Sequence, residues 1–280
     1  MASRAVIVGC GDVGGRLAQR LLARQWQVFG LRRDVARLPA GVIGLAADLR
    51  DAACPGQWPS GKLDYLVYCV AASQHDEAGY RQAYVDGLRH VLGWLEQNAQ
   101  APRRILFVSS SSVYGQADGE WVDEVSPTQV SGFSGRLMLE AEQSLLTSGF
   151  AGTVVRLTGI YGPGRARLVD QVRQGYRVAQ QPPLYGNRIH VDDAAGLLEF
   201  LLLADQQGTP LEECYIGVDD DPAPLFEVVA WLREYLGVTG WSATESVRRT
   251  GSKRCRNARA RALGWAPEYA SFREGYAAML

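Results

Sequence analysis

Residues 5–14 read Ala-Val-Ile-Val-Gly-Cys-Gly-Asp-Val-Gly, and this stretch decides the fold. Its first four residues are all apolar, which is typical of a strand buried on both faces. Gly9 then allows a tight turn, Gly11 leaves the backbone bare for a diphosphate, and Gly14 lets the following helix sit close to the sheet. The positive end of that helix stabilises phosphate charge. The string is a weak signal alone, but a strand before it and a helix after it give it the required context.

Similar apolar runs recur downstream and alternate with helical patterns. The helical faces have apolar residues at i, i+4 spacing, as in Val13, Leu17 and Leu21. This alternation predicts an α/β fold, a Rossmann-type doubly wound parallel sheet with helices on both sides. The further strands are expected at Val28–Leu31, Tyr65–Val70, Ile105–Val108 and Thr153–Val155.

The alternation of apolar runs and helical patterns ends after Tyr161, where Gly162-Pro163-Gly164 is a turn signal. We therefore expect residues 1–160 to form the dinucleotide-binding core, with residues 186–215 returning to it. Residues 161–185 and 216–280 are expected to form a smaller, C-terminal substrate-binding cap. Helices are predicted across Asp192–Ala204 and from about Leu225 to Leu236.

Composition narrows the classes of function. The net charge of −1 favours neither nucleic acid nor an anionic membrane, and the longest apolar run, Ala194–Ala204, is too short to span a bilayer. The first residues show no signal-peptide pattern, and the five cysteines are scattered without disulfide or metal-ligand spacing. We expect a cytoplasmic protein that binds no metal, nucleic acid or membrane.

The choice of cofactor depends on the end of the second strand, about 20 residues after the glycines. An NAD site usually places a carboxylate there, whereas this chain has Arg32 and Arg33, with Asp34 slightly late. A guanidinium fork suits the 2′-phosphate of NADP. NADP is therefore the expected cofactor, and NAD is the alternative if both arginines are merely solvated.

Three further strings, in family order, show a resemblance that runs over nearly the whole chain. The chain resembles the atypical or extended short-chain dehydrogenases, the NAD-dependent epimerase/dehydratase family. The strings are Val108-Ser109-Ser110-Ser111-Ser112-Val113-Tyr114-Gly115, then Val155-Arg156 with Ile160-Tyr161-Gly162-Pro163-Gly164, and Arg188-Ile189-His190-Val191-Asp192-Asp193-Ala194.

The resemblance implies a set of cofactor contacts. It places the glycine turn at the phosphates, Asp48 and Leu49 at the adenine, and the end of the fourth strand beneath the cofactor. The residues implied in this way are Gly9, Cys10, Gly11, Asp12, Val13, Gly14, Arg32, Arg33, Asp48, Leu49, Val70, Ala71, Ala72 and Ser109.

Family chemistry uses a serine or threonine with a tyrosine and, four residues later, a lysine. The serine falls on Ser110, with Ser111 close behind, and these two are the candidate catalytic residues. Alignment on Leu139-Glu140-Ala141-Glu142 puts Ser134 at the tyrosine position and Met138 at the lysine position. Since a serine hydroxyl has a far higher pKa than a phenol, ordinary hydride transfer is expected to be slow or missing. Arg136 is the nearest cation that could substitute for the lysine.

Two classes of function fit these residues. The first is an NADP-dependent oxidoreductase or epimerase-like enzyme acting on a small polar or nucleotide-sugar-like substrate. The second is a protein that binds NADP(H) without turnover, as a redox sensor or scaffold. Basic residues within 248–261 form either a solvated face or an anion site for a phosphorylated substrate, and the resemblance implies a homodimer.

Overall fold

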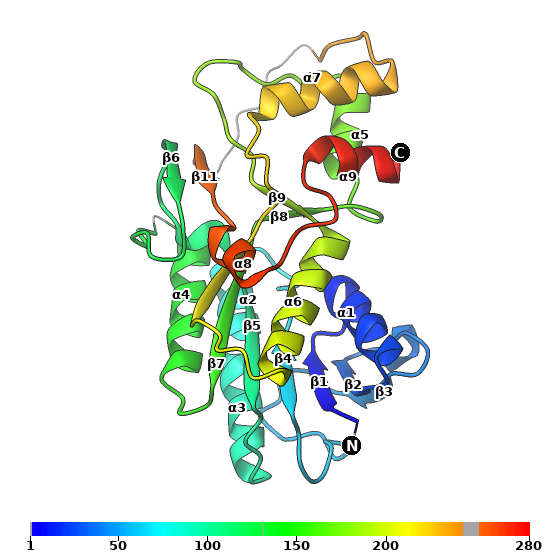
Figure 1. Cartoon of the computed structure of the whole chain (residues 1–280), viewed down its shortest axis with the longest axis vertical. Coiled ribbons are helices and arrows are strands. Elements are labelled where there is room, and N and C mark those ends of the chain that lie inside the picture. The colour runs from blue at the N-terminus through cyan, green and yellow to red at the C-terminus, as the bar shows by residue number, and fades with distance from the viewer. Residues whose placement is uncertain (1, 131, 243–251) are drawn as a thin grey trace. The chain divides into compact units, whose positions relative to one another are not determined.

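The computed structural model describes residues 2–130, 132–242 and 252–280 (Figure 1). It divides into two compact units. Unit 1 comprises residues 1–113, 130–156 and 195–215, and unit 2 comprises residues 114–129, 157–194 and 216–280. The expected core range 1–160 includes a segment, 114–129, that belongs to unit 2. Of the expected returning range 186–215, residues 195–215 belong to unit 1.

A seven-stranded sheet organises unit 1, in the order β10-β7-β5-β4-β1-β2-β3. β1 pairs in parallel with β2 and with β4, so the strand order reverses direction beside β1. This arrangement confirms the predicted Rossmann-type sheet. The strands are β1 (Arg4–Val8), β2 (Gln27–Arg32), β3 (Ile43–Ala46), β4 (Tyr65–Tyr68), β5 (Arg104–Ser110), β7 (Gly152–Leu157) and β10 (Cys214–Gly217).

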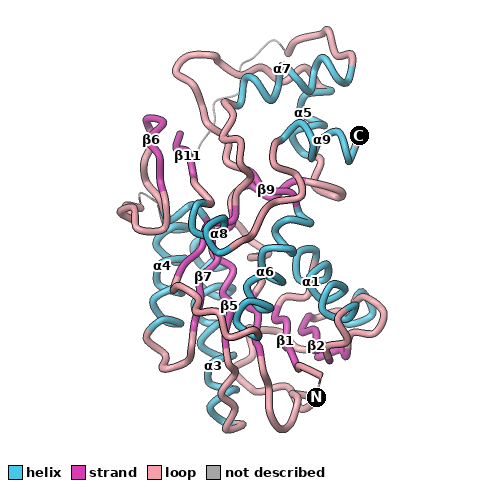
Figure 2. The backbone as a smooth tube through the Cα atoms, viewed as in Figure 1, coloured by secondary structure: helices cyan, strands magenta, loops and turns pink. Residues whose placement is uncertain are grey.

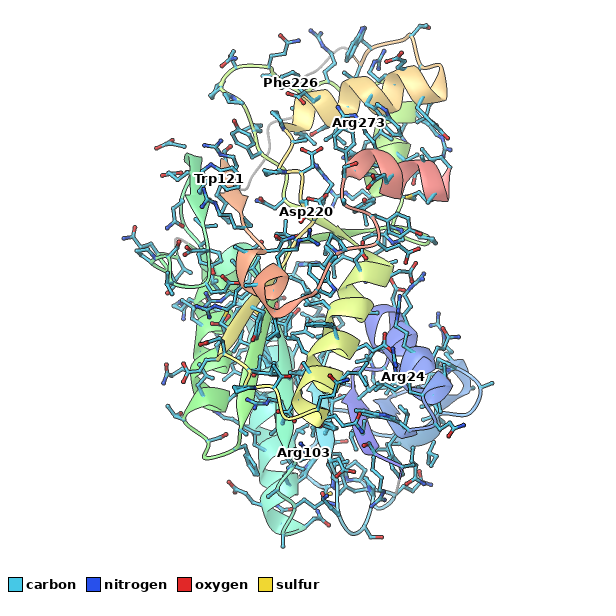
Figure 3. All side chains as sticks on the ribbon, in the orientation of Figure 1. Arg24, Arg103, Trp121, Asp220, Phe226 and Arg273 are labelled. Atoms are coloured by element: carbon cyan, nitrogen blue, oxygen red, sulfur yellow. The ribbon has the colours of Figure 1, made fainter. Side chains whose placement is uncertain are left out.

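Helices cover both faces of the sheet. The crossovers β1–β2 and β4–β5 run in opposite directions along it, so right-handed connections place α1 (Asp12–Ala23) and α3 (Gly87–Gln97) on opposite faces. α6 (Val191–Gln206) lies beside α1, because Glu199 accepts from Arg24 Nε at 2.5 Å; Figure 3 labels Arg24. α4 (Phe133–Leu146) lies beside α3. Short elements complete unit 1: η1 (Val35–Arg37), α2 (Glu77–Tyr80), a π-helical turn η2 (Arg81–Asp86) and η3 (Ser111–Val113).

The described residues of unit 2 form two small parallel strand pairs and several helices, which Figure 2 draws in magenta and cyan. An apolar cluster that includes Val228, Leu232 and Phe272 forms its core. The predicted helix from Leu225 to Leu236 is present with those bounds. The pairs are β6 (Asp118–Val122) with β11 (Ser252–Cys255) and β8 (Gly159–Tyr161) with β9 (Arg188–His190), and the helices are α5 (Arg167–Arg173), α7 (Leu225–Leu236), α8 (Ala258–Leu263) and α9 (Phe272–Met279).

None of the helices in the described part of the chain combines the length and the apolar character needed to cross a bilayer.

Candidate functional site

The glycine turn lies where the strand order reverses, at the carboxyl ends of β1 and β4. Gly9 has φ +83°, and a Cβ there would lie 2.5 Å from the Cys69 carbonyl oxygen. A Cβ on Gly14 would lie 2.7 Å from the Gly9 oxygen. A Cβ on Gly11 would lie 3.9 Å from the Gly9 oxygen and farther from every other atom that does not belong to Gly11 or its chain neighbours. The chain's own packing therefore requires glycine at positions 9 and 14, whereas at position 11 it leaves open space.

The helix that follows this turn is suited to hold an anion. α1 is 12 residues long, and its N-cap residue, Gly11, offers no side-chain acceptor to the first backbone N–H groups. Such an end carries partial positive charge. The Asp12 carboxylate accepts from Arg16 Nε at 3.1 Å. The Cys10 side chain is buried, and burial raises the pKa of its thiol to about 11, so it packs as a neutral group.

Arg32 is attached to the turn itself. Its Nη1 donates to the Cys10 carbonyl at 3.2 Å and to the Arg37 carbonyl at 3.1 Å. Arg33 is exposed at the end of β2. The Asp34 carboxylate accepts from the Ala36 N–H at 3.2 Å and so caps η1. The late carboxylate is thus used by the backbone, and the two arginines differ in their structural roles.

The predicted adenine residues lie just beyond β3. Asp48 accepts from Arg50, both from its backbone N–H at 3.0 Å and from Nε at 2.9 Å. These bonds lower the pKa of Asp48, and the Arg33 charge adds to that effect. The Leu49 carbonyl lies 2.9 Å from His90 Nδ1. Asp48 is therefore ionised and held in place, and the Arg33 charge acts on it.

The loop after β4 carries a contact that sequence reasoning missed. Val70 adjoins the turn, since its Cα lies 2.8 Å from the position of a Cβ on Gly9. Ala71 is exposed. The Ala72 N–H donates to the Tyr84 hydroxyl at 3.3 Å. No motif marks Tyr84, because it lies 12 residues away on a separate helical element.

The predicted serines have different environments. Ser109 is buried and donates its hydroxyl to Glu142 Oε1 at 2.5 Å. Glu142 is also held by Arg156, at 3.0 Å from Nε and 2.7 Å from Nη2. Ser110 is partly exposed at the end of β5, and its Oγ accepts from the Ser112 N–H at 3.1 Å. Ser111 begins η3 and is also partly exposed.

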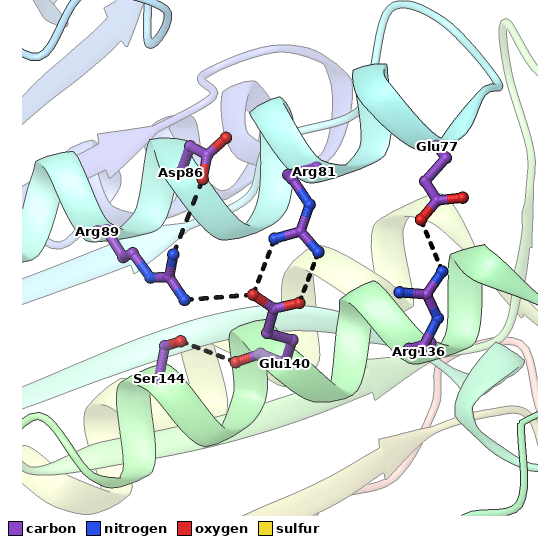
Figure 4. Close-up of polar contacts among 7 residues, drawn as sticks. All are labelled: Glu77, Arg81, Asp86, Arg89, Arg136, Glu140 and Ser144. Atoms are coloured by element: carbon purple, nitrogen blue, oxygen red, sulfur yellow. Dashed lines mark hydrogen bonds and ion pairs between the residues drawn. The ribbon is translucent and has the colours of Figure 1, made fainter.

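The two residues that the resemblance sets at the positions of the family tyrosine and lysine lie on α4. Ser134 is partly exposed in its first turn, while Met138 is buried in the core of unit 1. Arg136 points to α2, where its Nη2 pairs with Glu77 Oε1 at 2.6 Å (Figure 4). Arg136 is therefore already paired with a carboxylate, so it is poorly placed to act for the lysine.

Tyr161 and His190, two polar residues of the strings that resemble the family, lie in unit 2. The Tyr161 hydroxyl packs against the backbone, since a Cβ on Gly275 would lie 1.9 Å from it. His190 precedes α6, and its Nδ1 accepts from the Asp192 N–H at 3.3 Å. Both are buried, and their contacts are those of packing and helix capping.

The basic run of residues 248–261 is only partly described, since Arg248 and Arg249 lie outside the described residues. Lys253 Nζ donates to the Tyr114 carbonyl at 2.9 Å, and Arg254 Nε donates to the Gly119 carbonyl at 2.7 Å. These two cations hold the β6 region to β11. Among described residues, no group of three or more histidine, cysteine or acidic side chains could hold a metal ion.

Asp219 makes the stability of the protein depend on pH. It is buried beside Arg188, and burial raises the pKa of its carboxyl to about 8, against the opposing effect of the Arg188 charge. In the unfolded chain the pKa is about 3.9. Between about pH 3.9 and pH 8, Asp219 is protonated in the folded chain and ionised in the unfolded chain. Its contribution to the free energy of unfolding is therefore complete below about pH 3.9 and is lost as pH rises through 8.

We therefore expect Asp219→Asn, which mimics the protonated carboxyl, to gain stability relative to the natural chain as pH rises from 4 to 8. The difference in the free energy of unfolding should grow by at most about 1.4 kcal/mol for each pH unit. Urea unfolding of both chains at several pH values measures it. Parallel pH curves would show that Asp219 titrates alike in the folded and unfolded states.

The comparisons with known proteins agree with this geometry. The model of the NAD dependent epimerase/dehydratase family matches residues 5–217. A solved structure of an inferred NAD-dependent epimerase/dehydratase from Methylobacillus flagellatus is 37% identical, with a TM-score of 0.81 over 100% of this chain and 98% of that one. A UDP-glucose 4-epimerase from Thermus thermophilus, solved with NAD, is 19% identical with a TM-score of 0.78 over 97% of this chain and 96% of that one, a likeness of fold alone.

Two curated relatives are similar in sequence. The 3-diazoavenalumate denitrifying reductase of a Streptomyces species is 27% identical, over 97% of this chain and 98% of its own length. Protein YeeZ of Escherichia coli is 29% identical, over 73% of this chain and 75% of its own. The family match spans the glycine turn, the end of β2 and the serines after β5, so the chain belongs to the NAD-dependent epimerase/dehydratase family.

Proposed function

We propose that this chain is an NADP-preferring oxidoreductase that acts on a small polar substrate, with a nucleotide sugar as the alternative substrate class. The observation that carries the preference is the end of β2. Arg32 and Arg33 are present there, and the Asp34 carboxylate is bonded to the Ala36 N–H of its own loop. Asp34 comes later than the position where an NAD site usually places its carboxylate, whereas a guanidinium at the end of the second strand suits a 2′-phosphate.

The residues of unit 1 fit the cofactor. The open backbone at Gly11 and the start of α1 would hold the diphosphate, Asp48 and Leu49 the adenine, and Arg33 the 2′-phosphate. The bound nicotinamide supplies or accepts a hydride. Ser110 accepts a bond from the Ser112 N–H, which leaves the proton of its own hydroxyl for a substrate oxygen.

Reduction is the direction that the comparisons favour. One curated relative, aligned over 97% of this chain, is named as a reductase. The solved structures with UDP-sugars are less than 25% identical, so they support the fold and not the substrate.

The two arginines are expected to give different results when each is replaced by alanine. Arg33→Ala removes an exposed charge and should weaken NADP binding by about 10- to 100-fold, as the loss of a charge-assisted bond of roughly 1.5–3 kcal/mol predicts, with NAD affinity unchanged. Arg32→Ala also removes the bond to the Cys10 carbonyl in the glycine turn, and should weaken both cofactors. Isothermal titration with NADPH and NADH measures these affinities.

Arg103→Ala is the matched control. Arg103 lies at the amino ends of the strands, beside the start of β5, whereas the glycine turn lies at their carboxyl ends. Equal losses of NADP and NAD affinity in Arg33→Ala would remove the argument for NADP. No binding of either cofactor to the natural chain would refute the proposed function as a whole.

A second candidate function is a sensor or scaffold that binds NADP(H) without turnover. It is supported by Ser134 and buried Met138, which stand where the resemblance expects the family tyrosine and lysine. Mixing the protein and NADPH with a panel of carbonyl compounds and nucleotide sugars, and following the absorbance of the reduced nicotinamide, separates the two. Tight binding of NADPH with no turnover across the panel would favour the sensor.

A further inference from the structure

The absent family tyrosine leaves the site without an evident proton donor. Neither Ser134 nor Met138 can serve, because an alkyl hydroxyl is a much weaker acid than a phenol and a thioether carries no proton. A replacement must be an acidic side chain close to the loop after β4 and to the start of α4. Among the described residues of unit 1, Tyr80 and Tyr84 are phenols in that region, whereas the nearby Tyr68 is buried and its hydroxyl donates to a backbone carbonyl.

These phenols connect the predicted cofactor loop with the start of α4. The Tyr84 hydroxyl accepts from the Ala72 N–H at 3.3 Å, and its ring lies 5.2 Å from the ring of Tyr80. Tyr80 in turn packs edge-on against Phe133, with ring centroids 5.4 Å apart. Phe133 directly precedes Ser134, the position of the absent tyrosine. Tyr84 is the phenol of the two that is bonded to the cofactor loop.

A π-helical turn sets the direction of Tyr84. The turn η2 covers Arg81–Asp86, and such wide turns are rare and occur frequently at functional sites. It is supported from the sheet, because the buried Tyr68 hydroxyl donates to the Ala83 carbonyl within it. Gly87 leaves room for that hydroxyl, since a Cβ at this position would lie 2.6 Å from it. On the other side, Arg81 and Arg89 both bond Glu140 of α4 (Figure 4).

The hydrogen bond to Tyr84 has the polarity that proton donation requires. Because the hydroxyl oxygen accepts from the Ala72 N–H, its own proton points elsewhere, and the same N–H stabilises the phenolate left behind. Burial raises the pKa of Tyr84, and the nearby Tyr80 and Cys69 raise it further. The bond from the Ala72 N–H lowers it in part. The phenol is therefore protonated at neutral pH, which is the form that a reduction consumes.

We propose that Tyr84 is the proton donor of this site, in place of the absent family tyrosine; this rests on the proposed reductase function. In the step, a substrate carbonyl carbon receives a hydride from the reduced nicotinamide, and the carbonyl oxygen takes the Tyr84 proton. The carbonyl is reduced to an alcohol and the nicotinamide is oxidised. The Tyr84 phenolate then regains a proton from water.

The first test reads Tyr84 directly and needs no substrate. The protein is labelled with [ζ-13C]tyrosine and titrated with pH, with and without saturating NADP+, and the Tyr84 resonance is assigned from Tyr84→Phe. The positive charge of the oxidised nicotinamide beside the phenol should lower the pKa of Tyr84 by about one pH unit or more. Tyr80→Phe, the matched control, should retain this shift.

The second test measures turnover with NADPH and an activated dicarbonyl such as an aromatic ortho-quinone, together with the carbonyl panel. Tyr84→Phe should lower kcat by about 10²- to 10⁴-fold, the usual contribution of a positioned acid, with NADPH affinity within about two-fold. Tyr80→Phe should lower it by less than about ten-fold. Unchanged melting temperatures would exclude misfolding.

The outcomes separate this proposal from the proposed function. If NADPH binds but the Tyr84 resonance is indifferent to NADP+, or Tyr84→Phe keeps the natural rate, Tyr84 is not the donor and the cofactor proposal stands. If neither NADPH nor NADP+ binds, both proposals fail. If no compound in the panel is reduced, the NADP+-dependent shift of the Tyr84 pKa decides alone.

Discussion

Gly11→Ala is expected to abolish binding of the dinucleotide while the protein keeps its fold. Apart from its neighbours along the chain, the added methyl group would lie nearest to the Gly9 oxygen, at 3.9 Å. The chain itself therefore has room for it. It would occupy the space through which a diphosphate approaches the backbone and the start of α1. We expect affinity for NADPH to fall by about 100-fold or more, with a cost in stability of about 1 kcal/mol.

Gly9→Ala is the matched comparison, because it alters the same turn for a different reason. Its Cβ would lie 2.5 Å from the Cys69 oxygen and 2.8 Å from the Val70 Cα, at a backbone φ of +83°. Strain of this kind together with overpacking costs on the order of 3 kcal/mol or more, so this variant should lose stability as well as binding.

Thermal unfolding and isothermal titration with NADPH, applied to both variants, measure the two effects separately. If Gly11→Ala binds NADPH as the natural chain does, the diphosphate does not lie against this backbone. The assignment of the turn as the cofactor site would then be wrong.

Removal of the Glu142 carboxylate should destabilise the protein strongly. Glu142→Ala leaves the buried Arg156 guanidinium without its two bonds to the carboxylate and takes the acceptor from Ser109. Breaking a buried ion pair by removing one partner costs about 3–5 kcal/mol, since the remaining charge is left uncompensated in the interior. Urea unfolding should therefore show a large fall in the midpoint.

The paired variant Glu142→Leu with Arg156→Met tests the cause. If the uncompensated charge is responsible, replacing both partners with apolar side chains of similar volume should recover most of the lost stability. A double variant as unstable as Glu142→Ala would instead point to lost packing. NADPH titration of the double variant measures whether the bond between Ser109 and Glu142 also affects cofactor binding.

Local sequence patterns predicted the central elements of the fold well. β1, β2, β4, β5 and β7 were each predicted because both of their faces are buried in the sheet, which produces a continuous apolar run. β3 was missed because it lies at the edge of the sheet and only one of its four residues, Leu45, is buried. The excursion of residues 114–129 into unit 2 was also missed, since no composition change marks its ends.

The candidate site divides in the same way. The glycine spacing and the arginine pair are visible in the sequence because they are properties of neighbouring residues, and the replacement of the family Tyr and Lys stays a prediction from the family pattern. The use of Asp34 as a cap, the bond of Arg32 to the turn and the Ser109–Glu142–Arg156 network could not. Each depends on side-chain directions that form only when the strands and helices pack.

The sequence by itself determined the class of fold, the position of the turn and the family, because hydrophobic periodicity and glycine spacing act over short stretches of chain. Only the tertiary structure decided which glycine of the turn has open space beside it, which arginine bonds the turn, and that Tyr84 meets the loop after β4. The physical reason is distance along the chain. Ala72 and Tyr84, or Ser109 and Glu142, become neighbours only after the sheet and its covering helices have assembled.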